Sequence, residues 1–179
     1  MKTGRRLIGL TGTNASGKGE AAAFFMGRGF TYFSQSDVIR DELRQKNLEP
    51  TRDNLIREGN ELRQRFGPDI LARRVMDKVT GDSIIDSIRN PSEIEYWRIQ
   101  GNFILLAIDA PMEVRFQRAV SRGRDESAAS IEDFKAKEDQ EKTRDRMAQQ
   151  LETCMRMADS LILNDGTLEE YHKKLEAFL

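Results

Sequence analysis

The stretch Gly-Thr-Asn-Ala-Ser-Gly-Lys-Gly-Glu occupies residues 12–20, between an apolar run at residues 7–10 and a helix-forming run at residues 21–25. This order predicts a strand, a glycine-rich loop and a helix. The first two glycines are separated by four residues, and Lys18 follows the second. Such spacing lets backbone N–H groups surround an anion at the positive end of a helix, while the lysine reaches the outer phosphates. The stretch is therefore predicted to be a phosphate-binding loop.

Position 19 departs from the common form of this loop, in which a magnesium-binding Ser or Thr follows the lysine. Gly19 has no hydroxyl group, and Glu20 comes next. We therefore expect Mg²⁺ to be held mostly through water and the phosphates of the nucleotide, which suits an ion that dehydrates reluctantly. Two interpretations of Glu20 remain open: an outer-sphere contact to the metal, or an acid favoured by the dipole of the first helical turn.

Composition favours one globular domain. The chain has 179 residues, of which 38% are hydrophobic, and a formal charge of -1. This balance offers no overall attraction to nucleic acid or to an anionic membrane, so neither partner is expected. The apolar run at residues 103–108 is too short to span a bilayer, and the N-terminus lacks a signal-peptide pattern, so a cytoplasmic protein is expected. The single cysteine, Cys154, permits no internal disulfide and is interpreted as a small apolar residue on a helix.

Short β-rich runs alternate with longer helical patterns, which predicts a mostly parallel sheet covered on both faces. The expected strands lie at residues 7–11, 31–33, 83–86, 103–109 and 160–163. The expected helices lie at residues 17–28, 37–46, 51–65, 68–79, 91–98, 112–122, 130–155 and 167–178. We expect residues 1–179 to form a single α/β domain.

Two segments are longer than the connections between parallel strands require. Between residues 33 and 83 lie about three helices where one completes a crossover, so an acceptor-binding insertion is expected at about residues 36–80. A charged segment at about residues 123–146 would be costly to bury and suits an exposed helix. Two interpretations of this segment remain open: a solvated helix with i,i+4 ion pairs, or a lid that closes over a ligand.

Polar side chains follow the strands, at the edge where open parallel sheets bind ligands. Asp37 and Arg40 come after the second strand, three residues apart and hence on one helical face. The paired donors of Arg40 suit a phosphate group. Asp37 is either a functional acid or a helix cap, with Ser36 as a rival cap. Asp86 ends the third strand and is a candidate for holding Mg²⁺ through water.

Arginines gather after the fourth strand. Arg118 and Arg122 are four residues apart on one helical face, without the interleaved acids expected of a purely structural arginine stripe. Weaker candidates for the same cluster are Arg115, Arg124 and Arg144. His172 is interpreted as a surface residue without a role.

Several stretches resemble known kinases. Residues 17–19, Gly-Lys-Gly, and residues 34–40 resemble the donor loop and the acceptor-phosphate segment of adenylate kinase and other nucleoside monophosphate kinases. Residues 158–170 resemble the C-terminal stretch of dephospho-CoA kinase. Over nearly its whole length the chain resembles P-loop kinases of the nucleoside monophosphate kinase group. The resemblance implies a three-layer α/β/α P-loop NTPase fold, with a five-stranded parallel sheet in the order 2-3-1-4-5 and two helical insertions.

The resemblance also implies roles for individual residues, with ATP and Mg²⁺ as cofactors. Arg40 and Arg89 would bind the acceptor phosphate, and Asp37 matches the general base of dephospho-CoA kinase. Charge on the transferred group would be neutralised by the catalytic residues Lys18, Arg118 and Arg122. The ATP-binding residues would be Gly12, Thr13, Asn14, Ala15, Ser16, Gly17, Lys18, Gly19 and Glu20 in the loop, and Asn164 and Gly166 in a turn against the adenine.

The leading functional hypothesis is transfer of the ATP γ-phosphoryl group to a nucleotide-like acceptor, above all a nucleoside monophosphate. Two alternatives remain open: phosphorylation of a ribose hydroxyl on dephospho-CoA, and a nucleotide-binding regulator with little turnover. Gly19 departs from the pattern of dephospho-CoA kinase, and the segment from Asp86 to Arg89 departs from that of adenylate kinase. The expected partner is a small-molecule nucleotide acceptor, and the protein is expected to be a monomer or a homodimer.

Overall fold

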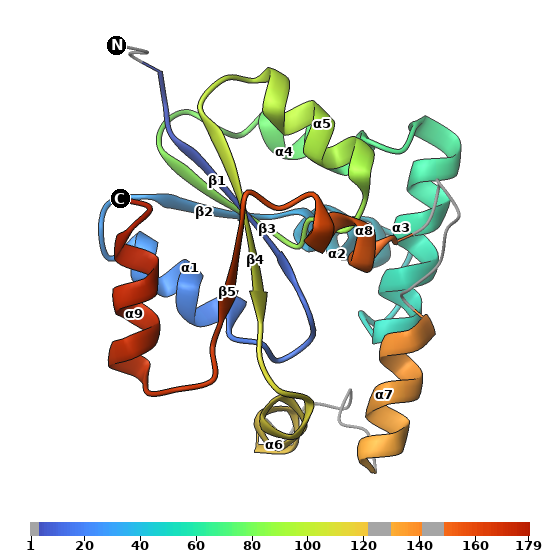
Figure 1. Cartoon of the computed structure of the whole chain (residues 1–179). Helices are drawn as coiled ribbons and strands as arrows, with labels where there is room; N and C mark the ends of the chain where they lie inside the picture. Colours follow the sequence, from blue (N-terminus) through green and yellow to red (C-terminus); the bar gives the residue numbers. More distant parts are fainter. Residues whose placement is uncertain (1–3, 122–129, 141–148) are drawn as a thin grey trace.

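A five-stranded parallel sheet lies at the centre of the structure, with helices on both of its faces (Figure 1). The computed structural model describes residues 4–121, 130–140 and 149–179. The strands are β1 (Leu7–Gly12), β2 (Thr31–Ser34), β3 (Ser83–Asp86), β4 (Phe103–Asp109) and β5 (Ser160–Leu163). Their order is β2-β3-β1-β4-β5, and all neighbours pair in parallel. The predicted fold class and strand order are therefore confirmed, and the loop after β1 leaves the middle of the sheet.

Helices fill the segments between and after the strands. They are α1 (Lys18–Met26), α2 (Gln35–Gln45), α3 (Arg52–Phe66), α4 (Ile70–Met76), α5 (Pro91–Ile99), α6 (Met112–Ser121), α7 (Ile131–Gln140), α8 (Leu151–Arg156) and α9 (Leu168–Glu176). Helices α2, α3 and α4 lie between β2 and β3, in the segment where the acceptor-binding insertion is expected. Of the expected lid at about residues 123–146, only residues 130–140 belong to the described structure.

The helix predicted for residues 130–155 is wrong as a continuous element. Gln149 and Gln150 are not helical, and α8 begins after them. The Gln150 N–H donates to the Arg89 carbonyl oxygen across 2.7 Å, which ties this segment to the loop after β3. A hydrogen bond to a distant segment therefore interrupts a pattern that is helical when judged locally.

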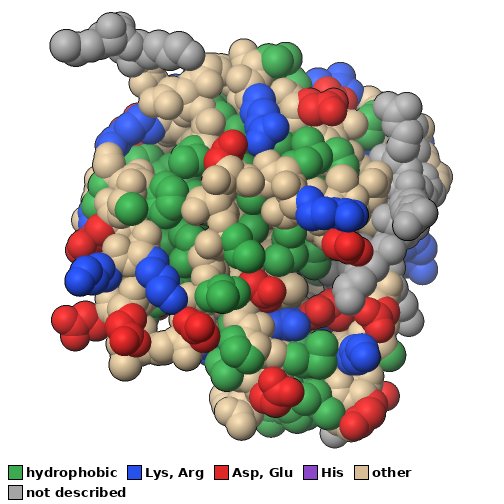
Figure 2. All heavy atoms as spheres, viewed as in Figure 1, with side chains coloured by type: hydrophobic (Ala, Val, Ile, Leu, Met, Phe, Trp, Pro, Cys, Tyr) green, Lys and Arg blue, Asp and Glu red, His purple; other side chains and the backbone are tan. Residues whose placement is uncertain are grey.

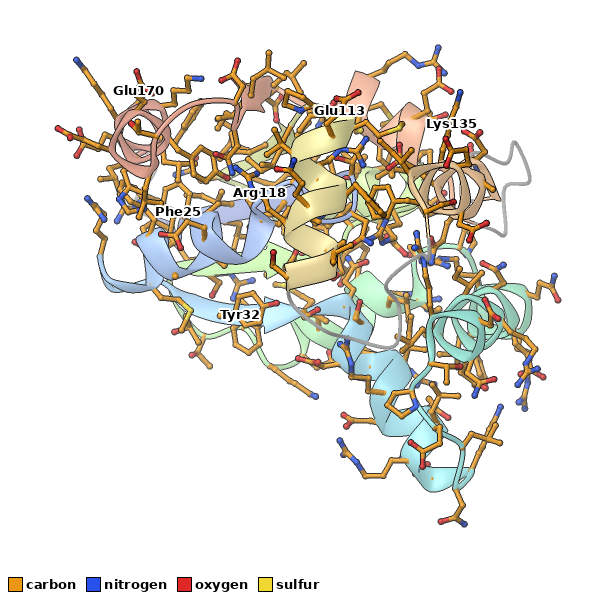
Figure 3. All side chains as sticks on the ribbon, turned by 90° about the horizontal axis from the view of Figure 1, so that it is seen from below. Phe25, Tyr32, Glu113, Arg118, Lys135 and Glu170 are labelled. Atoms are coloured by element: carbon orange, nitrogen blue, oxygen red, sulfur yellow. The ribbon has the colours of Figure 1, made fainter. Side chains whose placement is uncertain are left out.

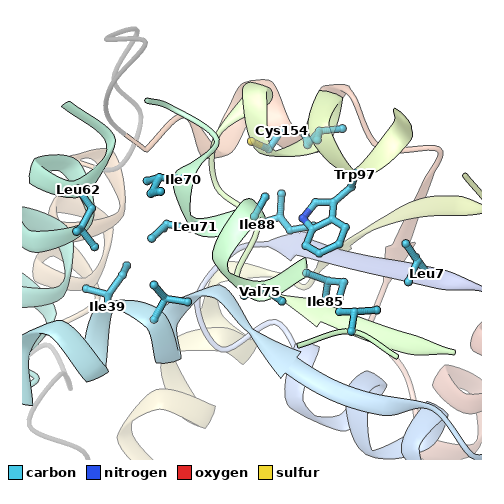
Figure 4. Packing of buried hydrophobic residues seen from close by; sticks show 14 of the residues in the cluster. Leu7, Ile39, Leu62, Ile70, Leu71, Val75, Ile85, Ile88, Trp97 and Cys154 are labelled. Atoms are coloured by element: carbon cyan, nitrogen blue, oxygen red, sulfur yellow. The ribbon is translucent and has the colours of Figure 1, made fainter. Parts of the chain in front are cut away.

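Successive strand residues face two separate hydrophobic clusters. Leu7 faces the cluster beneath α2, α3, α4, α5 and α8, which contains the fully buried Trp97 (Figure 4). The Trp97 ring stacks on Phe103, with ring centroids 6.3 Å apart. Ile8, the next residue, faces the cluster under α1 and α9, which includes Phe25. This two-residue period is expected of a central strand that is buried on both faces.

Cys154 belongs to the first of these clusters. Its side chain is fully buried, and burial raises the pKa of the thiol. A thiol that stays protonated is neither a nucleophile nor a good metal ligand. In the structure Cys154 therefore acts as a small apolar residue, as its helical context predicts.

Charged side chains of both signs are mixed over the face of the molecule that Figure 2 shows. This distribution agrees with the near-neutral formal charge of the chain. Among the described residues, no helix combines the length and the apolar character that a bilayer crossing requires.

The carboxylate of Glu93, in the first turn of α5, is fully buried and joins several segments. Its Oε1 accepts hydrogen bonds from Arg63 of α3, from Nε at 3.0 Å and from Nη2 at 2.8 Å. Its Oε2 accepts from the backbone N–H groups of Arg89 and Asn90, at 3.0 and 3.1 Å. Gln35, at the start of α2, donates to the same oxygen across 2.8 Å once its amide is oriented to satisfy its neighbours. A buried ion pair is tolerated when further hydrogen bonds satisfy its remaining atoms, as they do here.

We expect Glu93→Ala to lower the free energy of unfolding by about 3–5 kcal/mol, because the substitution leaves the buried Arg63 guanidinium without its carboxylate. The matched control is Glu152→Ala, which removes a surface pair with Arg156 at 3.5 Å. That variant should lose less than about 1 kcal/mol. Urea unfolding followed by circular dichroism measures both values, and equal losses would contradict the structural role of Glu93.

Candidate active site

Two glycines with positive φ shape the loop between β1 and α1. Gly12 has φ 133°, and a Cβ atom there would lie 2.0 Å from the Ile108 carbonyl oxygen of β4. Gly17 has φ 111°, and a Cβ atom there would lie 2.2 Å from the Asn164 amide nitrogen. Both positions therefore need glycine for backbone conformation and for space. The two glycines of the sequence motif are the residues that let the loop curl tightly against β4 and β5.

This loop presents donors to an anion. In the described part of the chain no side chain caps α1, so the first backbone N–H groups of that helix are directed at the loop. The fully buried hydroxyl of Ser16 likewise has no hydrogen-bond partner among the described residues. The ammonium group of Lys18 lies over the loop, donating to the carbonyl oxygens of Gly12 and Thr13 at 2.9 and 2.7 Å. Together these groups fit a bound phosphate.

The loop is supported from the C-terminal part of the chain. The Asn164 amide donates to the Ser16 carbonyl oxygen across 2.9 Å, and the Tyr171 hydroxyl donates to the Gly17 carbonyl oxygen across 3.1 Å. Burial, assisted by the negative charge of Glu20, raises the pKa of Tyr171, so its hydroxyl remains a donor. Asn164 thus has a role beside the loop that the sequence motif did not predict.

The loop forms part of a cleft of about 580 Å³ that extends to α2, α3 and the end of β3. On the insertion side its wall is partly apolar, with Ile39, Leu55, Ile56 and Leu71. The cationic residues of the lining are Lys18, Arg40, Arg52, Arg63 and Arg89, and the acidic ones are Glu20 and Asp86. This excess of positive charge favours an anionic ligand.

The structure brings many of the predicted site residues into this one cleft. Those that line it are Asn14, Ala15, Ser16, Gly17, Lys18, Gly19, Glu20, Arg40, Asp86 and Arg89. Predicted residues that are described but are not part of the lining are Gly12, Thr13, Asp37, Arg118, Asn164 and Gly166. Arg122, Arg124 and Arg144 lie outside the described residues. The individual roles assigned to all these residues stay predictions.

The start of α2 differs from the prediction. Ser34 caps the helix by accepting from the Ser36 N–H at 3.2 Å, so the suggestion that Ser36 or Asp37 is the cap is wrong. One Asp37 oxygen accepts from Arg40 at 3.1 Å, and both side chains are substantially exposed. Arg40 reaches the cleft, whereas Asp37 is not among the described residues that line it.

At the end of β3, Asp86 forms part of the cleft wall. Its Oδ2 accepts from the Tyr32 hydroxyl of β2 at 3.0 Å, and its Oδ1 accepts from the Ser87 N–H at 2.6 Å. Burial and the charge of Asp86 raise the pKa of Tyr32, which keeps the tyrosine neutral and donating. The carboxylate is therefore held in one orientation by one donor on β2 and another directly after β3.

Two arginines of α6 have different environments. Arg118 donates to the Ser16 carbonyl oxygen at 3.4 Å and so lies beside the loop; Figure 3 shows it on the side of α6 near α1. Arg115 is buried, pairs with Glu138 of α7 and donates to the Asn14 carbonyl oxygen at 3.4 Å. Helix α6 thus connects the loop to α7, and Arg115 has structural partners that the sequence did not reveal.

Other contacts were also missed by the sequence analysis. His172 Nε2 lies 2.7 Å from Glu20 Oε1, a contact that the sequence did not predict, and the interpretation of His172 as a residue without a role stays a prediction. Arg63, Tyr32 and Gln149 line the cleft without belonging to any motif. No local signal marks these residues, because their contacts come from segments far away in the sequence.

Comparison with known proteins places the chain in a family. A family model described as AAA domain, a P-loop NTPase family, matches residues 8–142. A UPF0200/UPF0201 protein of Archaeoglobus fulgidus is 32% identical over 182 residues, which cover 97% of this chain and 55% of that protein. A UPF0200 protein of Methanothrix thermoacetophila is 32% identical over 179 residues, covering 97% of this chain and 96% of that protein. The chain belongs to the UPF0200 family. It spans about half the length of the Archaeoglobus relative and nearly all of the Methanothrix one.

Solved structures show that this UPF0200 chain has the fold of P-loop kinases. The crystal structure of TT1252 from Thermus thermophilus matches with a TM-score of 0.61 and 21% identity, covering 98% of this chain and 97% of that chain. Shikimate kinase from Bacteroides thetaiotaomicron matches with a TM-score of 0.59 and 12% identity, covering 97% of each chain. At these identities the similarity concerns the fold alone. The closer grouping with nucleoside monophosphate kinases or dephospho-CoA kinase stays a hypothesis.

We expect Asn164→Ala to weaken ATP binding about tenfold, because the loop loses the hydrogen bond that holds the Ser16 carbonyl group. Asn102→Ala is the matched control, since Asn102 is exposed and precedes β4 at the end of the sheet opposite the loop. The dissociation constants of ATP, measured by calorimetry, should differ between the two variants. Equal constants would show that the loop does not depend on Asn164.

Proposed function

We propose that this protein transfers the γ-phosphoryl group of ATP to a nucleoside monophosphate. The observation that carries the proposal is that one cleft contains both a phosphate-binding loop and, toward α2 and the end of β3, two further arginines, Arg40 and Arg89. A phosphotransferase needs a cradle for the donor and a separate cationic site that orients the acceptor. The arrangement meets both needs within about 580 Å³.

The donor side of the proposal rests on the loop. Backbone N–H groups at the start of α1 and the orphan hydroxyl of Ser16 fit the phosphates of ATP. Lys18 and Arg118, which both contact loop carbonyl groups, would stabilise charge on the transferred group. Asp86 would hold Mg²⁺ through water, and the ion would supply further neutralisation of the donor phosphates.

The acceptor side rests on charge and shape. The guanidinium groups of Arg40 and Arg89 suit a phosphate because each offers paired donors. The neighbouring lining residues Ile39, Leu55 and Ile56 are apolar and suit the flat face of a nucleoside base. A phosphate joined to an aromatic ring therefore matches this side of the cleft better than a small polyol does.

The state of the carboxylates favours a phosphate acceptor over a hydroxyl acceptor. A hydroxyl group needs a general base within hydrogen-bonding reach, whereas a phosphate monoester is already ionised near neutral pH. Asp37, the predicted base, is paired with Arg40 and is not among the described lining residues. Asp86 is the residue that the proposal assigns to Mg²⁺, so the proposal does not use it as the base. The proposal therefore prefers a nucleoside monophosphate to dephospho-CoA.

An acceptor panel tests the proposal. We expect ATP, Mg²⁺ and at least one nucleoside monophosphate to give the corresponding diphosphate, detected by product mass over many turnovers. Lys18→Ala should lower turnover by about 10²–10³-fold through the loss of charge stabilisation, whereas Lys78→Ala, at an exposed site after α4, should leave it unchanged. Phosphorylation of dephospho-CoA alone, or ATP binding without any product, would refute the proposal.

Arg40 provides a test of the acceptor side alone. We expect Arg40→Ala to raise the KM of the acceptor about 10–100-fold by removing charge-assisted hydrogen bonds, and to leave the KM of ATP unchanged. Arg44→Ala is the matched control, because Arg44 lies one turn further along α2 and pairs with Asp41 on the surface. Steady-state kinetics with each substrate varied in turn measures the effect. A rise in the KM of ATP, or an equal effect in Arg44→Ala, would contradict the assignment.

A further inference from the structure

Gln149 is located on the acceptor side of the cleft. It lines the cleft directly before the first residues of α8. The next residue, Gln150, donates its N–H to the Arg89 carbonyl oxygen across 2.7 Å, which fixes this backbone against the loop after β3. That loop carries Arg89, one of the two arginines proposed to bind the acceptor phosphate. Gln149 is thus held next to the acceptor end of the cleft.

The amide oxygen of Gln149 has no hydrogen-bond donor in the described structure. The residue is only 8% exposed, and its Oε1 is a buried atom without a partner in residues 4–121, 130–140 and 149–179. The large majority of buried polar side-chain atoms in folded proteins do have a partner. An orphan acceptor in a residue that lines a ligand cleft therefore indicates that a donor arrives with the ligand.

The carboxylates of the cleft are already engaged. Asp86 accepts from the Tyr32 hydroxyl at 3.0 Å, and Glu20 lies 2.7 Å from the ring nitrogen of His172. The oxygen of Gln149 differs from these groups because it is uncharged and uncommitted. It is suited to accept from a neutral N–H group and does not require a cation.

The other lining residues near the insertion indicate which kind of molecule would carry that N–H group. Ile39, Leu55, Ile56 and Leu71 give this end of the cleft apolar surface, which suits the faces of a flat ring. Arg40 binds at the phosphate end under the function proposed above. A ring with apolar faces and an N–H group at its edge is a nucleoside base.

We propose that Gln149 is a specificity-determining residue, whose side-chain oxygen accepts a hydrogen bond from an N–H group on the base of the acceptor nucleotide. The inference rests on the proposed function and adds the part of the acceptor that is recognised. A site built to accept such a bond discriminates against an analogue without the N–H group, because the buried oxygen is then left unpaired.

Matched ligands that differ in this one group test the inference. Adenosine monophosphate is compared with purine riboside 5′-monophosphate, which lacks the amino group. Uridine monophosphate is compared with N3-methyluridine 5′-monophosphate, which lacks the ring N–H group. Dissociation constants are measured by calorimetry, without turnover, for the wild-type protein, for Gln149→Met and for Gln149→Glu.

In at least one pair the wild-type protein should bind the N–H ligand about tenfold more tightly than its analogue. In Gln149→Met the ratio should fall to about one, since methionine keeps the length of the side chain and removes its acceptor. Gln149→Glu should retain the preference, because a carboxylate still accepts the bond. The ratio compares two ligands on the same variant, so a general weakening of binding does not imitate the result.

Two results would overturn the inference alone: ratios near one in both pairs for the wild-type protein, or an unchanged ratio in Gln149→Met. In either case the monophosphates still bind, and the proposed kinase function stands. Failure of all four ligands to bind would overturn this inference, and the proposed function would fall with it only if no other monophosphate of the acceptor panel gave a diphosphate. The wild-type ratios need no variant, so the test holds even where a substitution prevents folding.

Discussion

The part of the cleft formed by α2, α3 and the loop after β3 depends on one buried carboxylate, that of Glu93. It binds the Arg63 side chain of α3, the backbone of the loop that carries Arg89, and the Gln35 amide at the start of α2. These groups belong to three different segments that meet around Glu93. A buried charge that loses a partner destabilises the folded state. The start of α2, α3 and the loop after β3 are therefore held in one relative arrangement. The position of each cleft residue on these segments follows from that constraint.

The elements that the sequence predicted correctly are those that depend on residues close together in the chain. The loop at residues 12–20 is recognisable because glycine spacing and a following lysine are needed for its shape. The nearly continuous apolar run of β4 reflects burial on both faces of the sheet. Arg63 and Glu93, or Glu20 and His172, could not be paired in this way, since each pair joins segments that meet only in the folded chain. The same reason explains the error at residues 130–155, where Gln150 bonds to Arg89 instead of continuing a helix.

The family and the fold say less about which molecules can bind than the residues of the cleft do. The solved P-loop kinase structures share the fold of this chain, and one fold can serve many unrelated functions. The cleft of this chain combines arginines, apolar side chains and an amide oxygen that has no donor among the described residues, at the end proposed to bind the acceptor. Under the proposed function, specificity would reside in α2, α3 and the segment before α8, whereas the phosphate-binding loop would bind the donor.

The central position of β1 has a consequence for how the protein is made. Leu7 pairs with Ser83 on one side and with Phe103 on the other, so the strand that precedes the loop has no partner strand until β3 has been made and lacks its second partner until β4 follows. Asn164 and Tyr171, which hold the loop itself, come later still. Contacts so distant in sequence form slowly, because a long segment must first be closed. During synthesis the residues that begin the chain are thus among the last to acquire their final shape.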